Sequence, residues 1–323
     1  MTRLAYILAA SHSGSTLLAM LLGAHPETCT AGELKATNLG DVDRYLCSCG
    51  TAIRRCSFWT RVHAEMENRG VSFDIADART DIRAAPTPYT RRLLKPLHRG
   101  RLLECVRDAG LALSPAWRHH LARTQQRNEA LVGTVAAITG ARVVIDSSKV
   151  ALRLKYLLRN PGLDVRVIRL IRDGRAVALT YVDPARFADA SDPSRRGGGT
   201  GRARDEEKLP LADAAHEWRR SNEEAEHVLA GLHRGRWMQV RYEDVCMDTE
   251  NTLRRLFAFL GVDPDRAQRG FRSVEHHVIG NGMRLDLTSE VRLDDRWRSM
   301  LTEEDLRTFD RVAGGLNRRY GYT

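Results

Sequence analysis

The sequence has no run of eighteen or more apolar residues, the length that a helix needs to cross a bilayer. Its first apolar stretch, residues 4–10, is only seven residues long and leads directly into a polar turn. Removing this stretch as a signal peptide would destroy the turn, so we expect it to be retained. We therefore expect a protein without a transmembrane segment and with a cytoplasmic location.

Lysine is scarce: it accounts for five of the 51 Lys and Arg residues, and arginine for the other 46. With 41 acidic residues the formal net charge is +10, which favours anionic ligands such as phosphates, sulfates, acidic sugars or nucleic acid. The arginines are spread over the whole chain and do not form a basic arm. We therefore expect small anionic ligands and no nucleic-acid partner.

Cysteine is also sparse, with six residues, and three of them, Cys47, Cys49 and Cys56, lie close together in the sequence. A structural zinc site needs four ligands, and the only nearby candidate for the fourth is His63. A disulfide or plain free thiols are therefore the interpretations that we prefer, and we assign no metal ligand.

Short β-branched runs alternate with helical stretches along the chain. Strands are expected at residues 4–10, 141–145, 164–171 and 236–242. Helices are expected at residues 17–23, 58–69, 102–109, 121–135, 150–158, 176–182, 211–232, 249–260 and 303–318. The alternation predicts an α/β fold with a P-loop-like, doubly wound sheet of mainly parallel strands flanked by helices. We expect a single domain over residues 1–323, with a helical insertion at about 35–135 and a flexible, lid-like loop at about 191–208.

The chain is organised around the polar turn of residues 11–16, Ser-His-Ser-Gly-Ser-Thr, which separates the first strand from the first helix. A strand, a small-residue loop and a helix in this order direct backbone N–H groups and the helix dipole at one point, where an anion can bind. Gly14 allows a close approach of the backbone. Ser13, Ser15 and Thr16 add hydroxyl donors.

The same turn lacks the lysine of the nucleoside triphosphatase loop, G-x-x-x-x-G-K-[ST]. Ser15 stands at the lysine position and Ala9 at the first glycine position. Without the point charge of the lysine, the turn suits a single terminal phosphate better than a triphosphate. From the turn alone, an ordinary strand-to-helix connection stays equally open.

Charged residues also follow other strands, at the edge of the sheet where α/β folds bind ligands. Lys149 follows the second expected strand and could place a positive charge on a transferring group. Arg172 follows the third and can grip a phosphate with two parallel hydrogen bonds, and Thr180 lies about two helical turns further on. Glu33 could act as a general base at the mouth of the turn, or it could be an ordinary surface or N-cap carboxylate.

Four separated stretches together resemble the PAPS-dependent sulfotransferases, whose sulfate donor is 3′-phosphoadenosine 5′-phosphosulfate. Residues 11–16 are similar to the family's 5′-phosphosulfate loop, usually [KR]-S-G-T-T, and residues 168–181, with RDGRAVALTY, to its 3′-phosphate motif. Residues 241–244 and the helix that ends in FAFLGV resemble its YED…FLG segment. GNGMR at residues 280–284 resembles the C-terminal stretch that completes the 3′-phosphate site.

The resemblance implies a role for each matching residue. Arg172 and Thr180 fall on the Arg and Ser that hold the 3′-phosphate, and Tyr242 falls on the tyrosine that lies near the adenine. Arg284 or Arg292 would complete the 3′-phosphate site. The cofactor-binding set is then Ser11, His12, Ser13, Gly14, Ser15, Thr16, Arg172, Thr180, Tyr242, Arg284 and Arg292.

The layout of HPE…GE and RDGRA looks closest to the tyrosylprotein sulfotransferases, their bacterial relatives and the carbohydrate sulfotransferase branch. In the tyrosylprotein subgroup, a glutamate 21 residues after the basic residue of the loop acts as base, and Glu33 stands 21 residues after His12. The resemblance implies that Glu33 takes the acceptor's proton, while His12 and Lys149 face the transferring group. His12 departs from the family's Lys or Arg, and a neutral imidazole stabilises less charge. No metal is required, because fixed cations take its place.

The predicted function is in-line transfer of the sulfuryl group from PAPS to a hydroxyl acceptor, a small molecule or a carbohydrate, with 3′-phosphoadenosine 5′-phosphate as product. The helical insertion is expected to shape the acceptor pocket. The alternatives are a P-loop kinase-like phosphotransferase, against which the missing lysine argues, and a non-enzymatic polyanion-binding protein, whose binding would follow salt and not ligand identity. The acceptor and the oligomeric state are left open.

Overall fold

The computed structural model of the chain describes residues 2–37, 39–84, 86–94, 100–188, 190, 195, 207–268 and 270–323. The expected loop at 191–208 lies outside these residues, apart from Arg195, Glu207 and Lys208. None of the helices within the described ranges is long and apolar enough to span a membrane.

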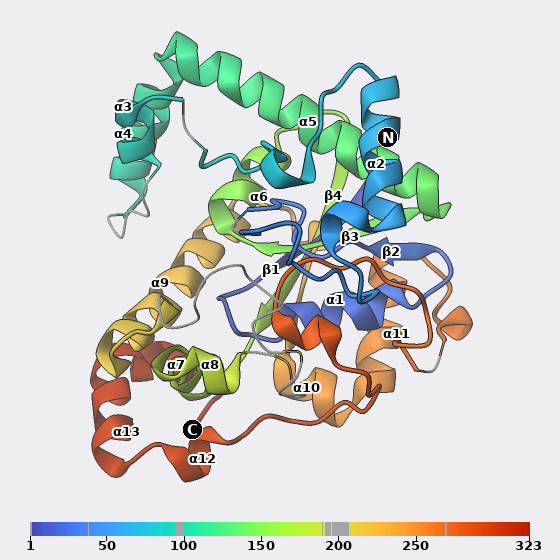
Figure 1. Cartoon of the computed structure of the whole chain (residues 1–323). Coiled ribbons are helices and arrows are strands. Elements are labelled where there is room, and N and C mark those ends of the chain that lie inside the picture. Colours follow the sequence, from blue (N-terminus) through green and yellow to red (C-terminus); the bar gives the residue numbers. More distant parts are fainter. Residues whose placement is uncertain are drawn as a thin grey trace.

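A sheet of five parallel strands forms the centre of the fold (Figure 1). The strands are β1 (Thr2–Leu8), β2 (Thr28–Thr30), β3 (Val143–Lys149), β4 (Leu163–Ile171) and β5 (Trp237–Arg241). Their spatial order is β2-β3-β1-β4-β5, so the chain winds outward from β1 in both directions. This arrangement confirms the predicted doubly wound, parallel α/β fold.

The edge strand β2 was not expected as a strand. It has only three residues, and Thr28, Cys29 and Thr30 pair with Val143, Val144 and Ile145 of β3. A strand of this length shows no periodicity that sequence reasoning could detect. Its importance is positional, because it delivers the following segment with Glu33 to the carboxyl edge of the sheet.

Helices cover both faces of the sheet (Figure 1). They are α1 (Ser15–Gly23), α2 (Ser57–Asn68), α3 (Pro88–Leu93), α4 (Gly100–Ala112), α5 (Pro115–Thr139), α6 (Ala151–Leu157), α7 (Gly174–Val182), α8 (Pro184–Phe187), α9 (Leu211–Ala230), α10 (Tyr242–Met247), α11 (Thr249–Leu260), α12 (Trp297–Met300), α13 (Glu303–Phe309) and α14 (Gly315–Arg319). A π-helical turn, Asp310–Gly314, joins the last two, where one continuous helix was expected. The other expected helices are present with ends shifted by a few residues, and α5 extends beyond its expected range at both ends.

Alternate side chains of β1 point to opposite faces of the sheet. Leu4, Tyr6 and Leu8 pack in one hydrophobic cluster with residues of α2, α5 and α6. Ala5 and Ile7 pack in a second cluster with α1 and α11. Because both faces are covered, residues 4–8 of the strand form one apolar run without polar alternation.

Part of the region that was expected as a helical insertion belongs to this core. Trp59 and Val62 of α2, and Leu131 and Val135 of α5, are buried in the cluster that covers one face of the sheet. These two helices therefore belong to the layer structure of the domain.

Candidate active site

A cavity of about 930 Å³ opens where the chain leaves the carboxyl ends of β1, β3 and β4. The predicted site residues on its wall are Ser11, His12, Gly14, Ser15, Thr16, Glu33, Lys149, Arg172, Thr180, Tyr242 and Arg292. Residues separated by more than 200 positions in the sequence thus share one pocket. Such a pocket at the carboxyl edge is the usual ligand site of an open α/β sheet.

The expected insertion reaches this cavity only through its first residues. The described residues of 35–135 on the cavity wall are Lys35, Ala36, Thr37, Leu39 and Tyr45, all of which precede α2. Glu104 and Arg107 of α4 line a second pocket, which shares Ser11, Lys35 and Lys149 with the cavity. That the insertion shapes the acceptor site therefore stays a prediction.

The opening turn has the backbone of an anion cradle. Gly14 has a φ of 85°, and a Cβ built on it would lie 2.5 Å from Cδ2 of Tyr242. Only glycine fits here, because of both the left-handed conformation and the aromatic ring. Gly14 has no side chain to cap α1, so the first N–H groups of this helix stay available at the end where the helix dipole is positive.

His12 also has a positive φ, of 62°, and its ring lies edge-on against Tyr181 with the centroids 4.5 Å apart. Tyr181 is half-buried, and the loss of solvent around its hydroxyl raises the pKa of that group, so that it stays a neutral donor. The His12 carbonyl accepts a hydrogen bond of 2.8 Å from Arg172. The turn after β1 is thereby connected to the end of β4.

Ser13 differs from the rest of the turn. Its side chain is buried, its Oγ has no hydrogen-bond partner among the described residues, and it is not on the cavity wall. The expectation that its hydroxyl contacts the ligand is therefore corrected, because the left-handed turn at His12 and Gly14 directs Ser13 into the protein.

Arg172 is held rigidly at the end of β4. Besides the His12 carbonyl, its guanidinium contacts the carbonyl and the carboxylate of Asp294 at 3.0 and 2.9 Å, and it lies 4.4 Å from the ring centroid of Tyr242. Its Nε is buried and has no acceptor within the described part of the chain. A buried guanidinium with a donor to spare is suited to bind an anion.

Asp294 is a site residue that the sequence reasoning missed. Burial alone would raise the pKa of its carboxyl, but a hydrogen bond from Arg296 and the charge of Arg172 lower that pKa well below its usual range. The carboxylate is therefore ionised at neutral pH and occupies part of the guanidinium that an anionic ligand would use. The surrounding sequence, VRLDDRW, shows no pattern that indicates this contact.

Thr180 is buried on the cavity wall, and its hydroxyl donates a hydrogen bond of 2.9 Å to the carbonyl of Ala176 within α7. Its oxygen can still accept a hydrogen bond. Donation to a ligand requires rotation of the hydroxyl away from the helix.

The two C-terminal arginine candidates have different positions. Arg284 is 1% exposed, and its guanidinium donates to the carbonyls of Gly280, Asn281 and Leu46. It is therefore not on the cavity wall, and the expectation that it binds the ligand is corrected. Arg292 is on the wall, with an exposed side chain paired to Glu290 at 2.7 Å, and it remains the candidate of the two.

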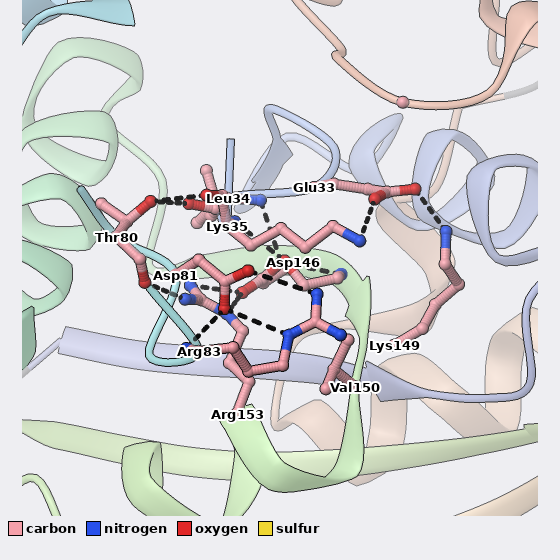
Figure 2. Close-up of polar contacts among 12 residues, drawn as sticks. Glu33, Leu34, Lys35, Thr80, Asp81, Arg83, Asp146, Lys149, Val150 and Arg153 are labelled. Atoms are coloured by element: carbon pink, nitrogen blue, oxygen red, sulfur yellow. Dashed lines mark hydrogen bonds and ion pairs between the residues drawn. The ribbon is translucent and has the colours of Figure 1, made fainter. Parts of the chain in front are cut away.

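The carboxylate of Glu33 lies between two lysines (Figure 2). One oxygen contacts Nζ of Lys149 and the other contacts Nζ of Lys35 at 3.0 Å. Burial would raise the pKa of Glu33, but the two ammonium groups outweigh it and hold the pKa at about 2. Glu33 is therefore fully ionised in the absence of ligand and can accept a proton.

Lys35 was not predicted as a site residue, although it is one of only five lysines and follows Glu33 by two positions. Lys149 was predicted, and it has a φ of 69°, which is rare for a residue with a side chain. The pairing of β1 with β3 shifts register at the same place. Irregular backbone of this kind is concentrated at functional sites, where it aims a side chain.

A buried ion pair supports the Glu33 cluster from behind (Figure 2). Asp146 and Arg153 are almost inaccessible to solvent and contact each other at 3.1 and 3.2 Å. The other Asp146 oxygen accepts hydrogen bonds from the backbone N–H of Leu34 and of Ser148. One carboxylate thus holds the segment that carries Glu33 against the strand end that carries Lys149.

Comparison with known proteins agrees with this geometry. The model of the sulfotransferase family matches residues 5–266. Carbohydrate sulfotransferase 5 of Mus musculus is 28% identical over 174 residues, which cover 51% of this chain and 44% of that protein. Carbohydrate sulfotransferase 3 of Homo sapiens is 28% identical over 177 residues, which cover 52% of this chain and 36% of that protein.

The matched segment is thus less than half the length of either curated relative. Among solved structures, the sulfotransferase domain from the curacin biosynthetic pathway aligns with a TM-score of 0.51 and 19% identity, covering 100% of this chain and 99% of that one, so the two share a fold. On the family match and the fold together, the chain belongs to the sulfotransferase family.

Proposed function

We propose that the protein is an enzyme that transfers the sulfuryl group of PAPS to a hydroxyl acceptor. The observation that carries the proposal is that one cavity contains the uncapped turn before α1, the buried Arg172 and the Glu33–Lys149 pair. These are two anion-binding features and one proton acceptor. A donor with phosphates at both ends and an acceptor that must lose a proton require this combination.

The residues present fit the adenosine donor. The bare N-terminus of α1 provides backbone donors for the 5′-phosphate, and the spare Nε of Arg172 is a buried donor for the 3′-phosphate. PAPS, when bound, supplies an electron-poor sulfuryl group and a phosphate leaving group. Arg292 and Arg296 at the rim add positive charge to the 3′-phosphate side.

The chain's own groups then have distinct tasks. Glu33 takes the proton of the acceptor hydroxyl, and Lys149 stabilises negative charge on the transferring group. An anionic group beside Lys149 competes with Glu33 for the ammonium, so the pKa of Glu33 rises when the site fills. The carboxylate thus becomes a stronger base only in the loaded site.

The acceptor class rests on the relatives. Both curated relatives are named as carbohydrate sulfotransferases, so a sugar hydroxyl is the class to test first, before small-molecule alcohols and phenols. A cytoplasmic location and the lack of a catalytic metal stay predictions.

The test is to incubate the purified protein with PAPS and a panel of hydroxyl acceptors and to follow the mass gain of one sulfonate. We expect transfer to at least one sugar, and binding of 3′-phosphoadenosine 5′-phosphate in calorimetry. Thermal protection by ATP and Mg²⁺ but not by this bisphosphate would instead indicate a phosphotransferase. Binding that depends on salt and not on ligand identity would indicate a polyanion-binding protein.

A further inference from the structure

Three cysteines and one histidine come together outside the cavity described above. The sulfur atoms of Cys47, Cys49 and Cys56 and a ring nitrogen of His277 all lie within 4.8 Å of one another. His277 is 221 residues from Cys56 in the sequence. His63, the fourth ligand that the sequence suggested, instead contacts the Phe73 carbonyl through its Nδ1.

The distances fit a tetrahedral metal site and not a disulfide. Sγ of Cys49 and Sγ of Cys56 are 3.7 Å apart, far beyond the bond length of about 2.05 Å in a disulfide. Nδ1 of His277 lies 3.3 Å from Sγ of Cys56 and 3.9 Å from Sγ of Cys47. Zinc bonds of about 2.3 Å to sulfur and about 2.0 Å to nitrogen place tetrahedral ligand atoms about 3.5–3.8 Å apart.

The imidazole of His277 is oriented as a metal ligand would be. Its Nε2 lies 3.2 Å from Oε1 of Glu275, while its Nδ1 faces the sulfurs. Donation of the Nε2 proton to a carboxylate leaves the lone pair of Nδ1 for a metal, which is the usual arrangement behind a metal-binding histidine. The ring also stacks on Phe58 with centroids 4.7 Å apart and planes 2° from parallel.

Hydrogen bonds hold the two halves of the cluster together. The N–H of Gly50 donates to the Cys47 carbonyl at 2.9 Å and closes a tight turn. The Ser48 hydroxyl donates to the His276 carbonyl at 2.6 Å and accepts from the N–H of Val278 at 2.8 Å. The residues on either side of His277 are therefore tied directly to the cysteine turn.

We propose that Cys47, Cys49, Cys56 and His277 bind one structural zinc ion. Three thiolates and an imidazole are soft and borderline ligands, which favour zinc over magnesium or calcium. The protein supplies all four positions, as in structural sites, whereas catalytic zinc keeps one position for water or substrate. Binding releases the thiol protons to solvent and requires no oxidant or reductant.

The zinc would hold one wall of the cavity. The segment of residues 277–280 runs from His277 to the cavity wall. Within it, the N–H of Ile279 donates to the Ala31 carbonyl at 3.0 Å, and the Ile279 carbonyl accepts from the Glu33 N–H at 3.1 Å. The next residue, Gly280, donates to the Tyr45 hydroxyl at 2.8 Å. A metal that fixes His277 to the cysteine turn would thus fix the segment that carries Glu33. The zinc site itself depends only on the cluster geometry and does not need the proposed activity.

The test begins with the metal content of the intact protein, purified without chelator. We expect one equivalent of zinc per chain in elemental mass analysis, and, after exchange with Co²⁺, the charge-transfer absorption of thiolate bound to tetrahedral cobalt. Iron in place of zinc, a metal-free protein that does not take up added Zn²⁺, or a mass two hydrogens lower from a Cys49–Cys56 disulfide would each overturn the proposal.

Matched variants then locate the metal. Cys49→Ser removes an exposed ligand and should lower zinc affinity at least tenfold in a competition titration with a chelator. Cys105→Ser, at an exposed cysteine outside the cluster, should keep the affinity of the unmodified protein. Glu275→Gln removes only the carboxylate behind His277 and should weaken zinc binding by about 10- to 100-fold. Equal zinc affinity of Cys49→Ser and Cys105→Ser would refute the assignment. Should Cys49→Ser fail to fold, the cobalt spectrum of the unmodified protein decides, since a spectrum without thiolate absorption refutes it.

Discussion

Two ion-paired clusters line the same cavity, and they differ in what lies behind them. At the end of β3, Glu33 and its two lysines have side chains only 13–15% exposed. The buried pair of Asp146 and Arg153 supports them from the interior. This cluster is built into the core, so its geometry is set before any ligand arrives.

The second cluster, at the end of β4, opens toward solvent. Arg172 itself is buried, but its partner Asp294 is 24% exposed and Arg296, the next partner, is 49% exposed. In the proposed function, the carboxylate of Asp294 is an internal anion that a phosphate of the ligand would displace from Arg172. The comparison teaches that ion pairs around one cavity can differ in support, since the Glu33 cluster is fixed from the interior and the Asp294 cluster is open to solvent. This difference is consistent with the proposed roles, a base in the first cluster and a displaceable anion in the second.

The largest effect should come from removal of the base at the buried cluster. Glu33→Gln keeps the shape but cannot accept the proton, so turnover should fall by about 10²- to 10⁴-fold. The measurement is the rate of sulfonate transfer by mass spectrometry. Affinity for 3′-phosphoadenosine 5′-phosphate should stay nearly unchanged.

Glu27→Gln is the matched control for this substitution. Glu27 also has a side chain 15% exposed and two arginine partners, Arg142 and Arg266, but it is not on the cavity wall. Full turnover in Glu33→Gln, or an equal loss in Glu27→Gln, would contradict the role of Glu33.

Removal of a supporting arginine should lower the free energy of unfolding much more at the Glu33 cluster than at the Asp294 cluster. Arg153→Ala leaves the carboxylate of Asp146 buried and unpaired, which should lower the free energy of unfolding by about 3–5 kcal/mol. Arg296→Ala removes a half-exposed partner of Asp294 and should cost about 1 kcal/mol or less. Denaturant titration of both variants measures the difference, and similar losses would show that the two clusters are equally supported.

The low pKa of Glu33 predicts a pH dependence of stability. The pKa falls from its ordinary value of 4.5 to about 2 on folding, so the unfolded chain binds more protons between these values. The stabilisation is complete above about pH 4.5 and is lost as the pH falls toward 2, a difference of about 3 kcal/mol. Thermal melts of the unmodified protein should decline more steeply over this range than those of Glu33→Gln, and parallel curves would exclude the shift.

Removal of the buried guanidinium should weaken nucleotide binding. Arg172→Ala loses charge-assisted hydrogen bonds worth about 1.5–3 kcal/mol, so the Kd for 3′-phosphoadenosine 5′-phosphate should rise by about 10- to 100-fold. Arg298→Ala, at an exposed arginine away from the cavity wall, is the control in the same calorimetric titration. Equal affinities of the two variants would remove Arg172 from the binding site.

The smallest effect should come from neutralising Asp294, whose carboxylate the nucleotide is proposed to displace from Arg172. Asp294→Asn removes the negative charge that competes with the nucleotide for Arg172, so affinity should rise by about two- to fivefold. Asp295 is the next residue, is exposed and is not the carboxylate that pairs with Arg172, so Asp295→Asn should leave affinity unchanged. Weaker binding in Asp294→Asn would mean that the carboxylate positions Arg172 and does not compete with the ligand.

Much of the site could be predicted because its parts are local. The turn of residues 11–16 lies between a strand and a helix that are both adjacent in the sequence, and Arg172 directly follows a strand whose composition is unmistakable. Parallel strands bring such ends to one edge, so the prediction of a shared site required no knowledge of distant contacts.

The predictions that failed depend on contacts across long stretches of sequence. Arg284 and Arg292 are eight residues apart, and each is followed by Leu-Asp in the sequence. Only the structure shows that Arg284 is buried, with backbone carbonyls around its guanidinium, one of them from Leu46. The short strand β2 exists because β3, more than a hundred residues later, pairs with it. Neither contact leaves a local pattern in the sequence.

The order of strands, turns and helices follows from local composition, because apolar runs, glycine and helix-ending residues act on their immediate neighbours. The meeting of His277 with three distant cysteines, and of Asp294 with Arg172, was decided only when the C-terminal segment packed across the carboxyl edge of the sheet. Packing of this kind depends on how many side chains from distant parts of the chain fit together, and a short stretch of sequence does not determine that fit.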